Sequence, residues 1–164
     1  MKNNIKLLSL TAIFTAVIYL FTAYLHIPSH TGYTHVGDAF IYLAACLLPT
    51  PYAVFAGSFS ALLADCLTGF AIWAPASVII KGVSVLFFCR KGKIIRAKNI
   101  LAFVFSAFVC IGGYYLYEAL IFSNFVSALA GIMGYITQSV LSGVLFIILG
   151  IALDKIDFKK RLGE

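Results

Sequence analysis

The sequence predicts an all-α integral membrane protein, a bundle of six transmembrane helices with both termini on the cytoplasmic side. Hydrophobic residues make up 62% of the 164 residues and charged residues only 11%, and the mean hydropathy is +1.02. A soluble domain carries about a quarter charged residues. A chain of this length is expected to form one compact bundle, a single transmembrane domain over residues 1–164.

Six apolar segments fit helices. A spanning helix needs about 20 apolar residues, and the first segment meets that length without a signal-peptide cleavage site. The run from 39 to 64 is too long for one helix, and Pro49-Thr50-Pro51 divides it. The second helix is therefore short, so it is tilted, shielded by its neighbours, or does not cross fully. Pro75 suits a first helical turn, and Ser123-Asn124 interrupts the last apolar region. The predicted helices span about 5–25, 38–49, 52–67, 75–89, 99–121 and 126–153.

The positive charges set the orientation. Eleven of the twelve Lys and Arg residues fall within residues 2–6, 90–98 and 155–161, the pattern of cytoplasmic loops rather than of a nucleic-acid-binding stripe. Six helices place all three clusters on the cytoplasmic side, whereas five would leave one outside. The last cluster is expected to touch anionic lipid headgroups.

Four ionisable residues then share one depth. In this topology Asp38, Asp65, Lys81 and Glu118 all fall in the outer half of the bundle, with Lys81 about 9 Å below the outer end of its helix. Charged groups inside a membrane are expensive and face a protected polar cavity. The four positions predict a solute pocket open to the outside.

Each group also has a structural interpretation. Asp38 could cap the second helix or contact a solute. Lys81 and Asp65 could pair with each other, or either could bind a polar solute. Trp73 lies where aromatic residues mark the membrane interface, yet a flat ring at a pocket mouth also stacks on heterocycles. His35 is either a solvated loop residue or part of a lid.

Further polar and aromatic residues lie near the same depth. Gln138 predicts an interhelical hydrogen bond, and Tyr114, Tyr115 and Tyr117 either line the pocket or pack. The predicted solute-binding residues are Tyr33, His35, Asp38, Asp65, Trp73, Lys81, Glu118 and Asn124.

Several chemistries are not expected. The segment from Gly32 begins with phosphate-loop spacing, but Asp38 stands where the lysine is required, so no ATP site is predicted. His26 and His30 have helical spacing for a metal pair, but Pro28 between them forbids the helix. Cys46, Cys66, Cys89 and Cys110 fall singly in different apolar segments. We expect no metal, no cofactor and no catalytic residue.

With these residues assembled, the chain resembles the substrate-binding S component of energy-coupling factor (ECF) transporters. The similarity lies in three motifs, G-Y-x-x-x-G-D, A-D-x-x-x-G-x-x-x-W-A-P and K-G, and covers almost the whole chain. Here the motifs are Gly32-Tyr33 with Gly37-Asp38, Ala64-Asp65 with Gly69 and Trp73-Ala74-Pro75, and Lys81-Gly82.

The resemblance implies a vitamin-capture subunit in a prokaryotic cell membrane, without a motor of its own. It would bind a small solute from outside, join a membrane coupling T component and two ATPases, and tumble to release the solute inside. An A-x-x-x-A face on the first helix docks on the coupling protein in this family, and Ala12 and Ala16 match it. In membranes such small residues let another helix approach closely.

The solute and the energy source stay open at this point. Chains with these motifs look closest to those for hydroxymethylpyrimidine (a thiamin precursor), pyridoxine-type vitamins or queuosine precursors. The mixed charges and aromatic residues favour a flat polar heterocycle over a lipid or an ion. The alternative is a proton- or ion-coupled transporter that needs no ATPase partner. An enzyme using the loop histidines is not expected.

Overall fold

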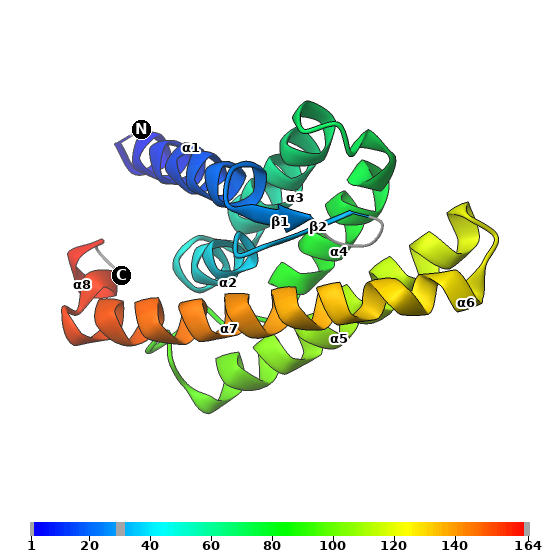
Figure 1. The fold of residues 1–164 in the computed structure, drawn as a ribbon. Coiled ribbons are helices and arrows are strands. Elements are labelled where there is room, and N and C mark those ends of the chain that lie inside the picture. Colours follow the sequence, from blue (N-terminus) through cyan, green and yellow to red (C-terminus); the bar gives the residue numbers. More distant parts are fainter. Residues whose placement is uncertain (1, 29–31, 163–164) are drawn as a thin grey trace.

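The computed structural model describes residues 2–28 and 32–162, and the fold is helical (Figure 1). Six helices of ten or more residues form its body: α1 Lys2–Ala23, α2 Asp38–Leu47, α3 Thr50–Leu67, α4 Ala74–Leu86, α5 Ala97–Ile121 and α7 Ile132–Lys155. Shorter elements connect them: β1 His26–Pro28, β2 Tyr33–His35, η1 Ala71–Trp73, α6 Phe125–Ala128, η2 Leu129–Gly131 and α8 Phe158–Arg161.

Prolines and turn residues set the helix boundaries. Pro49 precedes α3, and α3 and α4 each carry a proline in their first two positions, where the missing N–H costs no helical hydrogen bond. Gly69, at a φ of +90°, follows the end of α3 in a backbone conformation that glycine adopts freely. The breaks expected at Pro49-Thr50-Pro51 and before Pro75 are therefore present.

The predicted elements differ from the observed ones at several boundaries and in the loop after the first helix. The fourth helix ends at Leu86, before the predicted 89, and the last long helix begins only at Ile132 because α6 and η2 occupy the first residues of the predicted 126–153. The loop after the first helix contains an antiparallel hairpin of β1 and β2, with His26 opposite His35. The hairpin and α8 were not predicted, because three- or four-residue elements leave no periodic signal.

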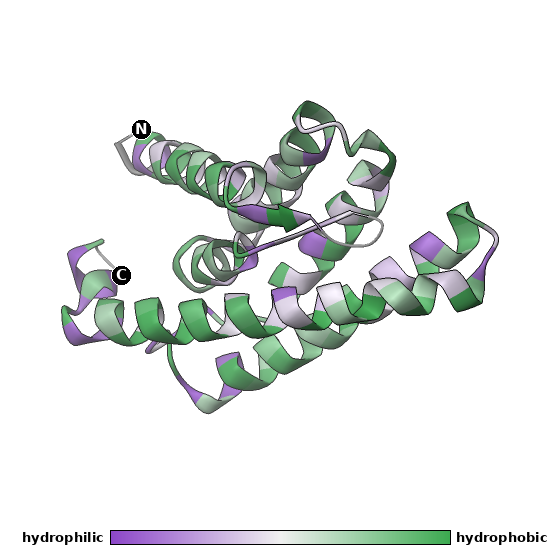
Figure 2. Ribbon diagram, in the orientation of Figure 1, coloured by the Kyte–Doolittle hydropathy of each residue, from purple (hydrophilic) through white to green (hydrophobic). Residues whose placement is uncertain are grey.

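Among the described residues, four helical stretches are long and apolar enough to cross a membrane: Asn4–Ala23, Thr50–Leu67, Ala97–Ile121 and Phe125–Lys155, which joins α6, η2 and α7. Asp38–Leu47 and Ala71–Leu86 are apolar but shorter. Figure 2 shows the ribbon coloured as hydrophobic along most of the helices. Large apolar side chains such as Leu8, Phe108 and Val144 are exposed on the outside of the bundle, where lipid would cover them. The count of six spans and their orientation stay predictions.

The short helix α2 lies at the centre. Nine of its ten residues are buried, and it packs against α1, α3, α4 and α7. Ile41 belongs to the apolar cluster it shares with α1 and α3, and Tyr42 to the cluster it shares with α7. Protein on all sides explains why a helix this short is almost entirely apolar: its surroundings, like lipid, offer no water.

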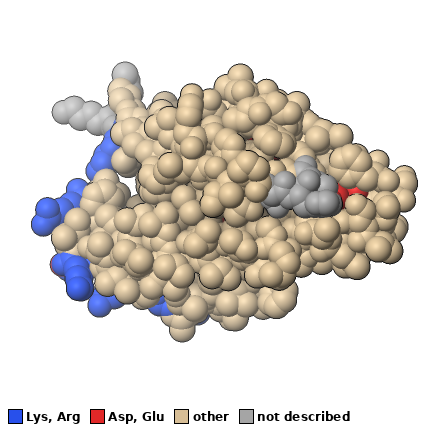
Figure 3. Space-filling view, in the orientation of Figure 1, with Lys and Arg blue, Asp and Glu red and all other residues tan. Residues whose placement is uncertain are grey.

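The two ends of the bundle differ in charge. The Lys6 ammonium donates to the carbonyl of Leu162, and the Lys159 ammonium donates to that of Arg90, so both termini and the basic loop lie together. Figure 3 shows Lys and Arg gathered at this end, with an acidic patch toward the other. Asp65 and Glu118 lie in the last turns of α3 and α5, helices that begin at the basic end.

Candidate functional site

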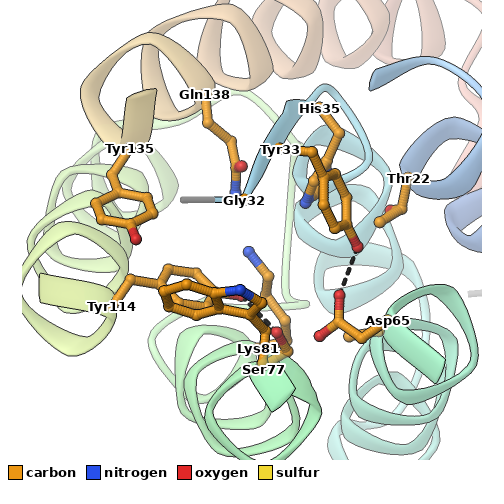
Figure 4. A pocket seen from close by; sticks show the side chains of 12 residues that line it. Thr22, Gly32, Tyr33, His35, Asp65, Ser77, Lys81, Tyr114, Tyr135 and Gln138 are labelled. Carbon is orange, nitrogen blue, oxygen red and sulfur yellow. Dashed lines mark hydrogen bonds between the residues drawn. The ribbon is translucent and has the colours of Figure 1, made fainter. Parts of the chain in front are cut away.

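A polar pocket lies at the end opposite the basic clusters, beneath β2 and between α1, α3, α4, α5 and α7. Its empty space is about 410 Å³, the open mouth included. Figure 4 shows the side chains converging on it from these elements. Its lining consists of Thr22, Gly32, Tyr33, His35, Ala61, Asp65, Trp73, Ser77, Lys81, Tyr114, Tyr135 and Gln138.

Lys81 and Asp38 form a buried ion pair at the base of the pocket. The Lys81 ammonium lies 2.8 Å from Oδ1 and 2.9 Å from Oδ2 of Asp38, and the two residues are 3% and 1% exposed. The Gln138 amide donates to the same Oδ2 at 2.8 Å. The ammonium also lies 5.2 Å from the centre of the Tyr114 ring. A buried charge needs such pairing, and the pair leaves the pocket base close to neutral.

This geometry corrects two interpretations of the sequence. The partner of Lys81 is Asp38, not Asp65, because the start of α2 faces the middle of α4. Asp38 makes no side-chain cap on α2; both of its oxygens contact the Lys81 ammonium, and Oδ2 also accepts from Gln138. The interhelical hydrogen bond predicted for Gln138 is present, and its side chain also lines the pocket.

Asp65 is a pocket-lining carboxylate with one oxygen hydrogen-bonded and the other left without a partner among the described residues. The Tyr33 hydroxyl donates to its Oδ1 at 2.5 Å, and Figure 4 shows the two side chains meeting at the pocket edge. Its Oδ2 is buried and has no hydrogen-bond partner among the described residues, although the residue is only 3% exposed. A buried polar atom left unpaired is costly, so this oxygen is a ready acceptor for a donor inside the pocket.

Aromatic rings form one wall. The rings of Tyr114 and Tyr135 are stacked with centroids 5.3 Å apart, and Trp73 meets Tyr114 edge-on at 6.1 Å. The hydroxyls of Ser77 and Tyr114 are hydrogen-bonded at 2.8 Å, which fixes the ring. Such a wall suits a flat ring that stacks on one face and hydrogen-bonds along its edge.

The hairpin lines one side of the pocket with Tyr33 and His35. His35 is buried, and its Nδ1 accepts a hydrogen bond from the Gly37 amide at 3.1 Å, which places the proton of the neutral ring on Nε2. Burial lowers the pKa of His35 to about 4. A Cβ on Gly37 would lie 2.1 Å from Oγ1 of Thr22, so glycine is required for the hairpin to lie this close to α1.

Glu118 and Asn124 stand behind or beside the pocket. Glu118 is buried, and its Oε2 accepts a hydrogen bond from the Tyr135 hydroxyl at 2.7 Å, so it orients a lining residue without lining the pocket itself. Asn124 is exposed and caps α6, its Oδ1 accepting from the Ser127 amide at 2.9 Å. The residues predicted from sequence that line the pocket are Tyr33, His35, Asp65, Trp73 and Lys81.

The family model described as the S component of ECF-type riboflavin transporters matches residues 2–155 of the chain. The chain belongs to this family. It is therefore a multi-pass membrane protein and the substrate-capture subunit of an ECF transporter, a class of transporter subunit and not of enzyme. Its partners are a membrane T component and ATPases, and its substrate is a small, vitamin-like molecule. No curated protein shows significant sequence similarity to the chain.

Sequence analysis of this S component missed several lining residues. Ser77 lies four residues before Lys81 on α4, and Tyr135 three residues before Gln138 on α7. These are the spacings that place two side chains on one helix face, so extending each helix face by one turn would have found both. Thr22 had no such signal, because its role depends on the approach of the hairpin.

No three His, Cys, Asp or Glu side chains among the described residues gather into a possible metal site. His26 lies at the start of β1, and its Nδ1 lies 2.7 Å from the carbonyl of Ala23. His30, its predicted partner in a metal pair, lies outside the described residues.

Proposed function

We propose that this S component captures a flat, polar heterocycle that presents a hydrogen-bond donor to Asp65. The observation that carries the proposal is the free Oδ2 of Asp65, buried in the pocket wall. A ligand N–H or O–H at this point would complete the carboxylate's hydrogen bonding. A ligand lacking that donor would leave the oxygen unpaired and bind much more weakly.

The other residues around the pocket each have a separate role in binding the solute. Lys81, held by Asp38, offers an ammonium N–H donor at the pocket base, and Gln138 beside it adds an amide that can meet a ring nitrogen or oxygen. Trp73 and Tyr114 provide the stacking surface, with Glu118 orienting Tyr135 behind them. Tyr33 and His35 cover the bound ring from the hairpin.

The candidate solutes follow from the family and the pocket chemistry. The family description names riboflavin, and the motif resemblance adds hydroxymethylpyrimidine, pyridoxine-type vitamins and queuosine precursors. All carry a planar ring with donors and acceptors along its edge. The compact pocket supports a single-ring solute or a small fused ring over a solute with a long polar chain.

The decisive experiment is mass spectrometry of small molecules released from the purified full-length protein, produced in a rich medium. We expect one heterocycle at close to one molecule per chain. It should be lost in Asp65→Asn and retained in Asp157→Asn, a matched change at the opposite end. Direct titration with the four candidate solutes then ranks them. Equal retention by both variants would remove Asp65 from the site.

We also propose six membrane spans in a prokaryotic cell membrane, with both termini and the 90–98 loop in the cytoplasm. The meeting of these basic segments at one end supports this orientation. In a Cys66→Ser background, a membrane-impermeant maleimide applied to intact cells should label Ser127→Cys and spare Arg161→Cys. Labelling of Arg161→Cys from outside would reverse the orientation.

Docking on the T component is proposed for one face of α1. Ala12 and Ala16 are both exposed and fall on the same stripe as Ile5, Leu8 and Leu20, so a smooth apolar surface faces away from the bundle. Ala12→Leu with Ala16→Leu should block ATP-dependent uptake and spare solute binding. Uptake that survives both changes would place the interface elsewhere.

Uptake that follows an ion gradient without the ATPases would favour the ion-coupled alternative.

A further inference from the structure

A second, larger cavity lies at the basic end, far from the capture pocket. Its empty space is about 1660 Å³, the open mouth included, and it shares no lining residue with the capture pocket. Three segments distant in sequence enclose it: the turn between α2 and α3 at Pro49 and Thr50, the loop from Arg90 to Lys93, and the chain from Asp154 into α8. Solute capture at the other end of the bundle does not require this second cavity.

The walls of this cavity are held by specific hydrogen bonds. The two oxygens of Asp154 accept the amides of Ile94 and Ile95, each at 2.8 Å, which fixes the loop against the end of α7. The Lys159 ammonium donates to the carbonyl of Gly92 at 2.7 Å and so holds α8 over the loop. The cavity is a defined feature of the fold rather than a gap between mobile tails.

Charge in the cavity is strongly unbalanced. Its lining includes five cationic residues, Arg90, Lys91, Lys93, Lys159 and Lys160, against two carboxylates. Both carboxylates are already engaged, Asp154 by the loop amides and Asp157 by Lys160 at 3.3 Å. A cleft lined by one sign of charge focuses the potential and concentrates ions of the opposite sign.

Two further features match an anion with several oxygens. The N-terminal end of α3, an 18-residue helix with no side-chain cap, opens into the cavity at Pro49 and Thr50, and this end of a helix dipole is positive. The Thr50 hydroxyl adds a neutral donor, and Arg and Lys form charge-assisted hydrogen bonds with phosphate oxygens. A carboxylate group offers fewer oxygens than a phosphate group, and so would satisfy fewer of these donors.

We propose that this cavity is a binding site for a phosphate-bearing anion on the cytoplasmic face. Two sources supply that chemistry at a membrane surface: the headgroup of an anionic phospholipid, or a free phosphorylated compound. A headgroup would enter from the bilayer edge of the mouth. A free anion would come from the cytoplasm.

The test uses the full chain and two arms. In detergent, isothermal titration with inorganic pyrophosphate reports a free anion; in nanodiscs, native mass spectrometry compares retention of phosphatidylglycerol with that of phosphatidylcholine. In whichever arm the parent protein binds its probe, we expect the double variant Lys91→Gln with Lys93→Gln to bind that probe at least tenfold more weakly. Pyrophosphate binding assigns the free anion, and selective phosphatidylglycerol retention without it assigns the headgroup.

The control variant lowers the net charge by the same two units as the test variant. Lys98→Gln with Arg161→Gln removes two exposed cations from the same end without touching the cavity lining, and it should leave binding within twofold of the parent. Melting temperatures of both double variants verify folding. Equal loss in the two variants would mean that general surface charge attracts the anion, and it would overturn the site. Binding of neither probe by the parent protein would overturn it as well.

Discussion

The two ends of this S component handle charge in opposite ways. At the pocket end, few charged groups are present and they are buried: Lys81 and Asp38 are 3% and 1% exposed and form contacts below 3 Å. At the basic end many cations are present and most are exposed, as the ion pair of Lys160 with Asp157 illustrates, with side chains 77% and 66% exposed.

The difference teaches what each arrangement is suited to do. A buried ion pair has fixed geometry and depends on both partners, because either charge left alone in an apolar interior is costly. It can therefore position a ligand and discriminate between solutes. Exposed cations are screened by water and salt, so each contributes little to stability.

Breaking the buried pair should produce the largest effect. Lys81→Met leaves the Asp38 carboxylate buried with only the Gln138 amide as a partner, and removing one partner of such a pair costs about 3–5 kcal/mol. We expect a clear fall in the melting temperature of the detergent-solubilised protein, together with loss of solute binding.

A double variant separates stability from recognition. Asp38→Leu with Lys81→Met removes both charges, and replacing a buried pair by apolar residues is often neutral. The melting temperature should recover most of the loss while solute binding stays absent. Recovery of binding as well would show that the pair acts only as a structural element.

An intermediate effect is expected from pH, through His35. Burial lowers its pKa to about 4, whereas an unfolded histidine titrates near 6.5. The unfolded state therefore binds the proton first, so the contribution of the neutral ring is complete above about pH 6.5 and is lost as the pH falls toward 4. Melting temperatures between pH 7 and pH 5 should decline, and His35→Gln should flatten the decline. An identical slope in the variant would assign the pH dependence to other groups.

The smallest effect is expected at the basic end. Lys160→Gln breaks the exposed pair with Asp157, and surface pairs of this kind contribute little or nothing measurable. The melting temperature should stay within experimental error of the parent at both low and high salt. A loss comparable with that of Lys81→Met would remove the contrast between the two ends.

Composition was enough to predict a helical membrane protein, and the prolines predicted the breaks at Pro49-Thr50-Pro51 and before Pro75, because apolar length and helix breaks act locally. The pocket could be predicted only in part. Asp65, Lys81 and Trp73 stood out as polar or aromatic residues at one depth, but the partner of Lys81 depends on how α2 lies against α4. Asn124 lay at the same depth as the pocket yet caps α6, since depth alone does not fix a direction around the bundle.

Glycine at position 37 has a steric consequence for the way the pocket is covered. The turn that joins β2 to α2 lies against Thr22 of α1, and His26 at the start of the hairpin lies beside the carbonyl of Ala23. The cover of the pocket is thus attached to the end of α1, the helix that also carries Ala12 and Ala16.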